Sequence, residues 1–154
     1  MKQFFRTCHV FRRPEGFFIF GVINTAYGGI TVPPVAKLPL VATASTLGEE
    51  VSRVLNRLPN HPTEVNLATA REPFLASLKE NGFKNVAAFE KKACLVAVHY
   101  DGGFYEVVPH QKADAGGFVA IAPTKMPRTL SMEAVGNAVL SALKVVSRIP
   151  PAKE

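Results

Sequence analysis

Tryptophan is absent from the 154-residue sequence, and aspartate occurs only at Asp101 and Asp114. The two cysteines, Cys8 and Cys94, have a spacing that fits neither a disulfide framework nor a metal-binding motif, so we expect both to be reduced and buried. No stretch approaches the roughly 20 uncharged apolar residues of a transmembrane helix. Residues 1–13 lack the continuous apolar core of a secretory signal peptide. These absences predict a cytoplasmic protein that does not associate with membranes.

The composition predicts a single domain, residues 1–154. Hydrophobic residues make up 47% of the chain and charged residues 19%, which is typical of a compact fold and excludes a disordered chain. A chain of this length buries about two-thirds of its unfolded surface, so it needs no disulfide or metal to fold. The net charge of +6 fits an anionic partner, but the basic residues are scattered along the sequence. Nucleic acid is therefore an alternative partner, not the expected one.

One segment of the sequence occurs twice, 88 positions apart. Aligned without a gap, residues 16–58 and 104–146 share seven identities, including Gly28-Gly29 opposite Gly116-Gly117. Six further aligned pairs differ in residue but keep the same chemical character. We infer an internal duplication. The two copies and the segment that links them are residues 3–58, 94–146 and 59–93.

Each copy is expected to form three strands and a helix. Residues 94–110 give the strongest local signal, because two apolar runs flank Asp101-Gly102-Gly103 as in a β-hairpin. By the duplication, a similar hairpin should turn at residues 12–15. The third strand of the first copy carries two prolines, which end it or place it at a sheet edge. The remaining strands are expected at residues 4–11, 16–24, 29–35 and 117–123.

Apolar residues at helical spacing predict a helix over residues 47–58 and another over 135–146. Thr46 and Ser131 are the expected N-caps of these helices. A glycine near each helix start is expected to let the helix lie close to the sheet. These glycines are Gly48 and Gly136. Two further short helices are expected in the linking segment, one in residues 73–83 that is stopped by Gly82 and one in residues 85–93 that is capped by Asn85.

These elements predict an α+β fold. Two βββα copies, related by a pseudo-twofold axis, would form one mostly antiparallel sheet with helices packed on it. A βββα unit cannot bury its own apolar faces, so two copies would share a single core.

The titratable residues form no recognisable catalytic set. Most glutamates fall on predicted helix surfaces or in connections, away from any pocket suited to acid–base catalysis. A zinc site that joins both cysteines to His9 and His99 is disfavoured, because adjacent strand residues point to opposite faces. The Gly-Gly pairs lead into strands, unlike a phosphate-binding loop. We predict no catalytic residue, no metal and no cofactor. A small enzyme with a pocket between the copies is the third hypothesis.

A Gly-Gly step stands before Ile30 and before Phe118, and each copy continues into a helix that begins Leu-Gly or Val-Gly. With the intervening "FLASLKENGFKNVAAFEKKACLVAV", the chain resembles the immunity proteins of bacterial contact-dependent growth inhibition systems, from about Phe17 to Leu143. The resemblance implies a non-enzymatic inhibitor in the cytoplasm of the producing cell. Such a protein binds the C-terminal toxin domain of a cognate secreted effector.

Partner binding would use the protein surface, and seven residues are the candidates. One tyrosine, one lysine and one aspartate are expected at hairpin tips, and two arginines flank the first hairpin, where arginine often forms binding hot spots. Two neighbouring glutamates would supply a local acidic patch, since inhibitors of nucleases are often acidic whereas this chain is basic. The candidates are Arg12, Arg13, Tyr27, Glu49, Glu50, Lys112 and Asp114.

Overall fold

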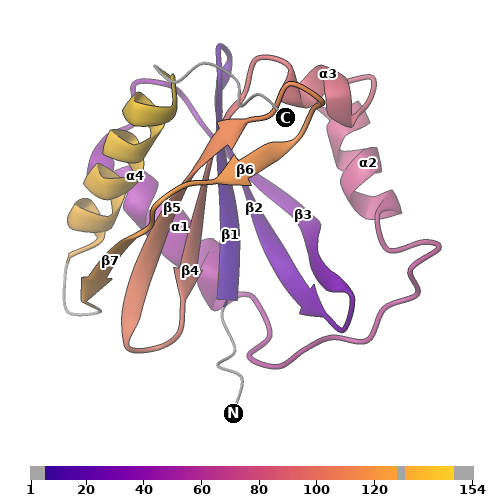
Figure 1. The fold of residues 1–154 in the computed structure, drawn as a ribbon, viewed down its shortest axis with the longest axis horizontal. Helices are drawn as coiled ribbons and strands as arrows, with labels where there is room; N and C mark the ends of the chain where they lie inside the picture. The colour runs from indigo at the N-terminus through magenta and orange to yellow at the C-terminus, as the bar shows by residue number, and fades with distance from the viewer. Residues whose placement is uncertain (1–5, 128–130, 148–154) are drawn as a thin grey trace.

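The computed structural model describes residues 6–127 and 131–147, which fold into one sheet with helices on both faces (Figure 1). The strands are β1 (Arg6–Arg13), β2 (Gly16–Thr25), β3 (Gly28–Leu38), β4 (Cys94–Tyr100), β5 (Phe104–Lys112), β6 (Phe118–Ala120) and β7 (Thr124–Pro127). The helices are α1 (Ala44–Asn56), α2 (Glu72–Glu80), α3 (Val86–Glu90) and α4 (Met132–Ser147). Within this part of the chain, no helix is long and apolar enough to cross a membrane.

The sheet has the order β3-β2-β1-β4-β5-β6, and β7 also pairs with β5. All six strand pairs are antiparallel. The predicted α+β class and antiparallel sheet are therefore confirmed. In both parts of the chain the strands run outward in sequence order from the central β1–β4 pair, while the origin of this arrangement by duplication stays a prediction.

Both predicted hairpins are present. In the β4–β5 turn, Asp101 Oδ1 accepts hydrogen bonds from the main-chain N–H groups of Gly103 at 2.7 Å and Phe104 at 2.9 Å. Such a side-chain acceptor satisfies turn amides that no strand can pair. The β1–β2 hairpin turns between Arg13 and Gly16, as predicted. The first two residues of its predicted strand, 4 and 5, lie outside the described residues.

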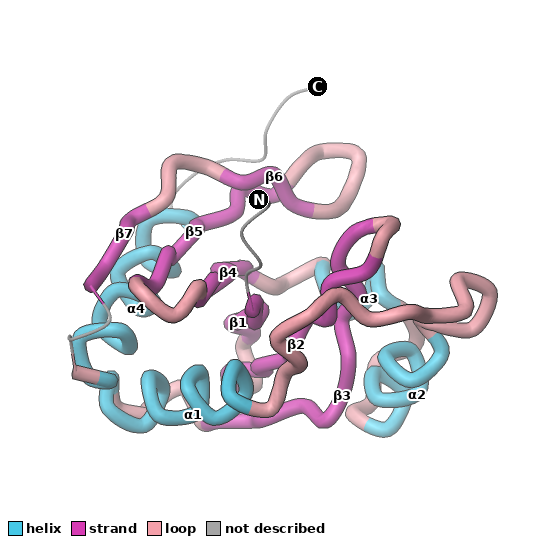
Figure 2. Tube along the Cα trace, turned by 90° about the horizontal axis from the view of Figure 1, so that it is seen from below, coloured by secondary structure: helices cyan, strands magenta, loops and turns pink. Residues whose placement is uncertain are grey.

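The third strand of the second copy differs from the prediction. Instead of one strand over residues 117–123, the chain forms β6 and β7, which pair with different parts of β5. The break between β6 and β7 coincides with two prolines, Pro123 between the two strands and Pro109 on β5. Proline has no N–H to donate to the hydrogen bonds of a sheet. Figures 1 and 2 show that β6, which stays paired with the end of β5, curls over the face of the sheet opposite α1. In the first copy, β3 continues through its prolines at the sheet edge.

Helices α1 and α4 cover one face of the sheet, as Figure 2 shows, and bury their predicted apolar stripes, except that Leu58, the last residue of the first stripe, is buried beyond the end of α1. Two details of the prediction are wrong. The side chain that caps α1 is Thr43, whose hydroxyl accepts from the N–H of Thr46 at 3.2 Å. Gly48 and Gly136 serve the contact between the two helices, not contact with the sheet, because a Cβ at either would meet the backbone of the other helix. Ser131 caps α4 as predicted.

The opposite face of the sheet is covered at one end by α2 and α3, both formed within the predicted linking segment. Asn85 caps α3, and Gly82, at a φ of 87°, follows the end of α2 as predicted. Phenylalanine rings packed edge to face fill this second core, an arrangement that aromatic quadrupoles favour. Its aromatic members are Phe11, Phe18, Phe20, Phe74, Phe83, Phe89 and Phe118.

Candidate interaction surface

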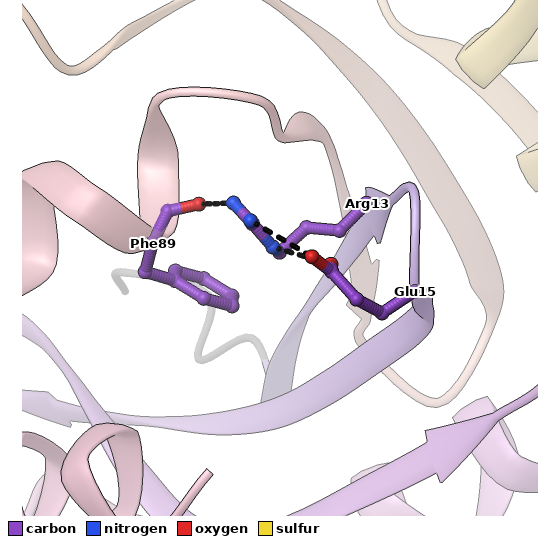
Figure 3. Close-up of polar contacts among 3 residues, drawn as sticks. All are labelled: Arg13, Glu15 and Phe89. Atoms are coloured by element: carbon purple, nitrogen blue, oxygen red, sulfur yellow. Dashed lines mark hydrogen bonds and ion pairs between the residues drawn. The ribbon is translucent and has the colours of Figure 1, made fainter. Parts of the chain in front are cut away.

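Arg13 ends β1 and is only 7% exposed. Its Nε donates to Glu15 Oε2 at 2.9 Å, and Nη1 donates to the main-chain carbonyl of Phe89 (Figure 3). The guanidinium also lies over the ring of Phe83, with Cζ 4.5 Å from the ring centroid. The hydrogen bond from Arg13 is the main cause that lowers the pKa of Glu15. Arg13 therefore ties α3 to the β1–β2 hairpin, and its contact with a partner stays a prediction.

Arg12 precedes Arg13 at the end of β1, whereas the two candidate glutamates lie on α1. Arg12 is half-buried in β1, opposite Phe17 and Cys94 in the strand register. On α1, Glu50 pairs with Arg53 at 2.8 Å and keeps a side-chain exposure of 16%, whereas Glu49 is exposed. The ion pair offsets part of the charge expected for an acidic patch at this position.

Lys112 and Asp114 line one cleft, about 400 Å³ in volume, between α3 and the β5–β6 turn. The Lys112 ammonium donates to the main-chain carbonyl of Lys91 at 2.6 Å. Burial lowers the pKa of Lys112 and raises the pKa of Glu90, which lines the same cleft. The two groups attract each other, which opposes both pKa shifts. The cleft thus holds a partly desolvated ammonium and carboxyl side by side.

Tyr27 stands at the tip of the β2–β3 turn and is 76% exposed. The turn is held by Thr25, whose hydroxyl donates to the carbonyl of Gly28 at 2.8 Å and accepts from the Tyr27 N–H at 3.1 Å. Tyr27 also lines a cleft between this turn and residues 62–65. An aromatic ring held out by a well-bonded turn is a common anchor of protein interfaces.

The candidate residues do not form a single patch. Figure 1 shows the β1–β2 and β5–β6 turns at one end of the sheet and the β2–β3 turn at the other. The first end carries Arg12, Arg13, Lys112 and Asp114, and the second carries Tyr27. A partner could therefore engage one end of the sheet without touching the other.

Three histidines, His9, His99 and His110, lie on the sheet face opposite α1 and α4, and the sequence had suggested proximity only for the first two. The ring centroids of His9 and His110 are 6.4 Å apart, and Thr7 Oγ1 lies 2.7 Å from His99 Nδ1. Burial lowers the pKa of His9 to about 4, and repulsion from His110 and His99 adds to this effect. The strand alternation of β1, β4 and β5, combined with the pairing of β4 to both of the other strands, was the signal that could have grouped them.

The zinc arrangement considered from the sequence does not form. Cys8 is buried in the core beneath α1 and α4, whereas His9 points to the other face. Burial also raises the pKa of the Cys8 thiol to about 12, which disfavours the thiolate that a metal needs. Within residues 6–127 and 131–147, no group of three or more His, Cys, Asp or Glu side chains could hold a metal ion.

Comparison with protein-family models and with curated proteins finds no match. Among solved structures, a protein of unknown function from Neisseria meningitidis superposes with a TM-score of 0.80 at 16% identity, over 94% of this chain and 97% of that chain. A chain of the CdiA-CT/CdiI toxin and immunity complex from Yersinia pseudotuberculosis superposes with a TM-score of 0.77 at 11% identity, over 91% and 96%. At these identities the likeness establishes the fold.

Proposed function

We propose that this chain is an immunity protein, which binds the toxin domain of a cognate contact-dependent growth inhibition effector and neutralises it stoichiometrically. The observation that carries the proposal is the similarity of its fold, over 91% of its length, to a chain of a toxin and immunity complex. That chain belongs to a protein–protein complex, so a protein partner is the first expectation here as well.

The surroundings of His9 and Arg13 support the role of inhibitor over that of toxin. His9 has a pKa near 4 because it is buried, and Arg13 is engaged by Glu15 and Phe89. Groups of this kind position neighbouring elements of a fold, whereas a general acid or base needs access to a substrate. Exposed turns such as the one at Tyr27 supply surface for binding a partner and need no catalytic group.

Expression of each protein alone and of both together tests the assignment of roles. The partner to be tested is a toxin domain encoded by a gene next to that of this chain. Cells that produce the toxin domain alone should stop growing, cells that produce this chain alone should grow normally, and co-expression should restore growth. Growth arrest by this chain alone would assign it the toxin role, and arrest despite co-expression would refute the proposal.

The net charge of +6 favours a second candidate, a nucleic-acid-binding module. Release of counterions makes such binding fall steeply with salt. The purified chain should show no binding to labelled duplex or single-stranded nucleic acid at about 0.15 M salt. Binding in the micromolar range or tighter that is lost above about 0.3 M salt would instead support the nucleic-acid-binding module.

A further inference from the structure

A cleft of about 500 Å³ opens beside the tip of the β2–β3 turn. One wall is the turn itself, residues 25–27, and the other is the segment 62–65 that follows α1. The segment is fixed to the end of β2, because the N–H of Thr63 donates to the carbonyl of Asn24 at 2.8 Å. The cleft therefore lies between two parts of the chain that are joined by a main-chain hydrogen bond.

The lining combines apolar surface with unused polar groups. Among the described residues, Glu64 is exposed and forms no ion pair. The hydroxyl of Thr63 is buried and has no hydrogen-bond partner within the same part of the chain. Tyr27 contributes an exposed aromatic ring, and Pro62 and Val65 contribute apolar surface.

We propose that this cleft, lined by Tyr27 and residues 62–65, docks a basic side chain, arginine or lysine, of the toxin domain. The proposal rests on the proposed function, since it names the place and the chemistry of the contact. Arginine and lysine carry an apolar stem and a cationic head. The stem packs against the apolar walls, and the head meets the carboxylate of Glu64 and the face of Tyr27.

Charge complementarity selects this occupant over others. An acidic side chain would be repelled by Glu64, and a purely apolar one would leave that carboxylate desolvated without a counter-charge. The overall charge of +6 does not oppose a cation here, because salt at physiological concentration screens exposed charges over about 8 Å. The carboxylate of Glu64 therefore determines that the docked side chain carries a positive charge.

Binding of the toxin domain to single variants, measured by calorimetry, tests the proposal. Y27A should weaken binding by about 30-fold, which is typical of an aromatic hot spot. E64Q should weaken it roughly tenfold, and E64K should weaken it more, because a like charge then faces the basic side chain. E80Q, at an exposed glutamate of α2, is the matched control and should bind as the unmodified chain does. Unchanged melting temperatures establish that the variants fold.

The outcomes separate this inference from the proposed function. If the unmodified chain does not bind the toxin domain, the proposed function fails. If it binds, and folded Y27A and E64Q bind equally well, the cleft is not the contact and the inference is wrong. Tighter binding by E64K would show that the partner presents an acidic group, which also overturns it. A smaller salt dependence of binding for E64Q than for E80Q supports the proposed ion pair.

Discussion

Gly48 on α1 and Gly136 on α4 lie at a close contact between the two helices. A Cβ at Gly48 would stand 1.8 Å from the main-chain oxygen of Met132, and a Cβ at Gly136 would stand 1.8 Å from that of Ala44. Both obstructing atoms belong to backbone, which cannot turn aside as a flexible side chain can. The two glycines therefore set the distance between the helices that cover one face of the sheet.

Substituting either glycine by alanine should destabilise the protein. Alanine favours a helix by about 1 kcal/mol over glycine, but the added methyl group forces α1 and α4 apart. We expect G48A and G136A each to lower the free energy of unfolding by about 3 kcal/mol, measured by urea denaturation. N137A, at an exposed position of α4, is the control and should change it little. An alanine variant as stable as the unmodified protein would contradict the close contact.

Arg13 should contribute far more to stability than an arginine in a surface pair. R13M leaves the carbonyl of Phe89 and the carboxylate of Glu15 without their donor, so we expect a loss of about 2 kcal/mol. In the control R53M, the pair with Glu50 is lost at a site where the arginine side chain is 58% exposed. That loss should stay below about 1 kcal/mol. Equal losses in urea denaturation would refute the structural role of Arg13.

The histidines should make the protein less stable in acid. The pKa of His9 is near 4 in the folded chain and about 6.5 in an unfolded one, so between these values the unfolded chain binds more protons. Stability attributable to His9 should therefore fall as the pH drops through this window, by about 3 kcal/mol in total. The pKa values of His99 and His110 are also lowered, mainly by burial, and act in the same direction.

Urea denaturation at several pH values between about 7 and 4.5 measures this effect. H9F removes the titrating group and keeps an aromatic ring beside Phe11, so its stability should depend less on pH than that of the unmodified protein. H61N, at an exposed histidine, should leave the dependence unchanged. Identical pH profiles for H9F and the unmodified protein would rule out the proposed role of His9.

The two thiols should differ in reactivity. Cys8 is fully buried and its pKa is raised to about 12, so it should react with a thiol reagent only when the protein unfolds. Cys94 is not buried as predicted but half-buried at the start of β4, so it should react faster in the folded protein. C94S should therefore show no fast phase, and C8S should keep it. A fast phase that persists in C94S would show that Cys8 is accessible.

Local sequence patterns predicted the elements of this fold well. The hairpin around Asp101, the caps at Asn85 and Ser131 and the stripes of α1 and α4 each depend on residues close together in sequence. From the duplication we predicted that Gly48 and Gly136 lie against the sheet, whereas each lies against the other helix. Which surface a helical glycine meets depends on how distant elements pack, and a sequence pattern does not contain that information.

The candidate site was predicted less completely. Tyr27 lies exposed at a hairpin tip as expected, because turn chemistry is local. Arg13 was expected at the surface, but α3, 76 residues away in sequence, covers it. The cleft beside Tyr27 likewise depends on the segment 62–65, which no local pattern places next to the β2–β3 turn. Long-range contacts account for both differences.

Titration of the purified toxin domain with this chain tests the central claim most directly. The activity of the toxin domain should fall linearly as the chain is added and should vanish at a one-to-one molar ratio. Heat-denatured chain should leave the activity unchanged, since the contact surface exists only in the folded protein. Full toxin activity in the presence of an excess of folded chain would contradict the account.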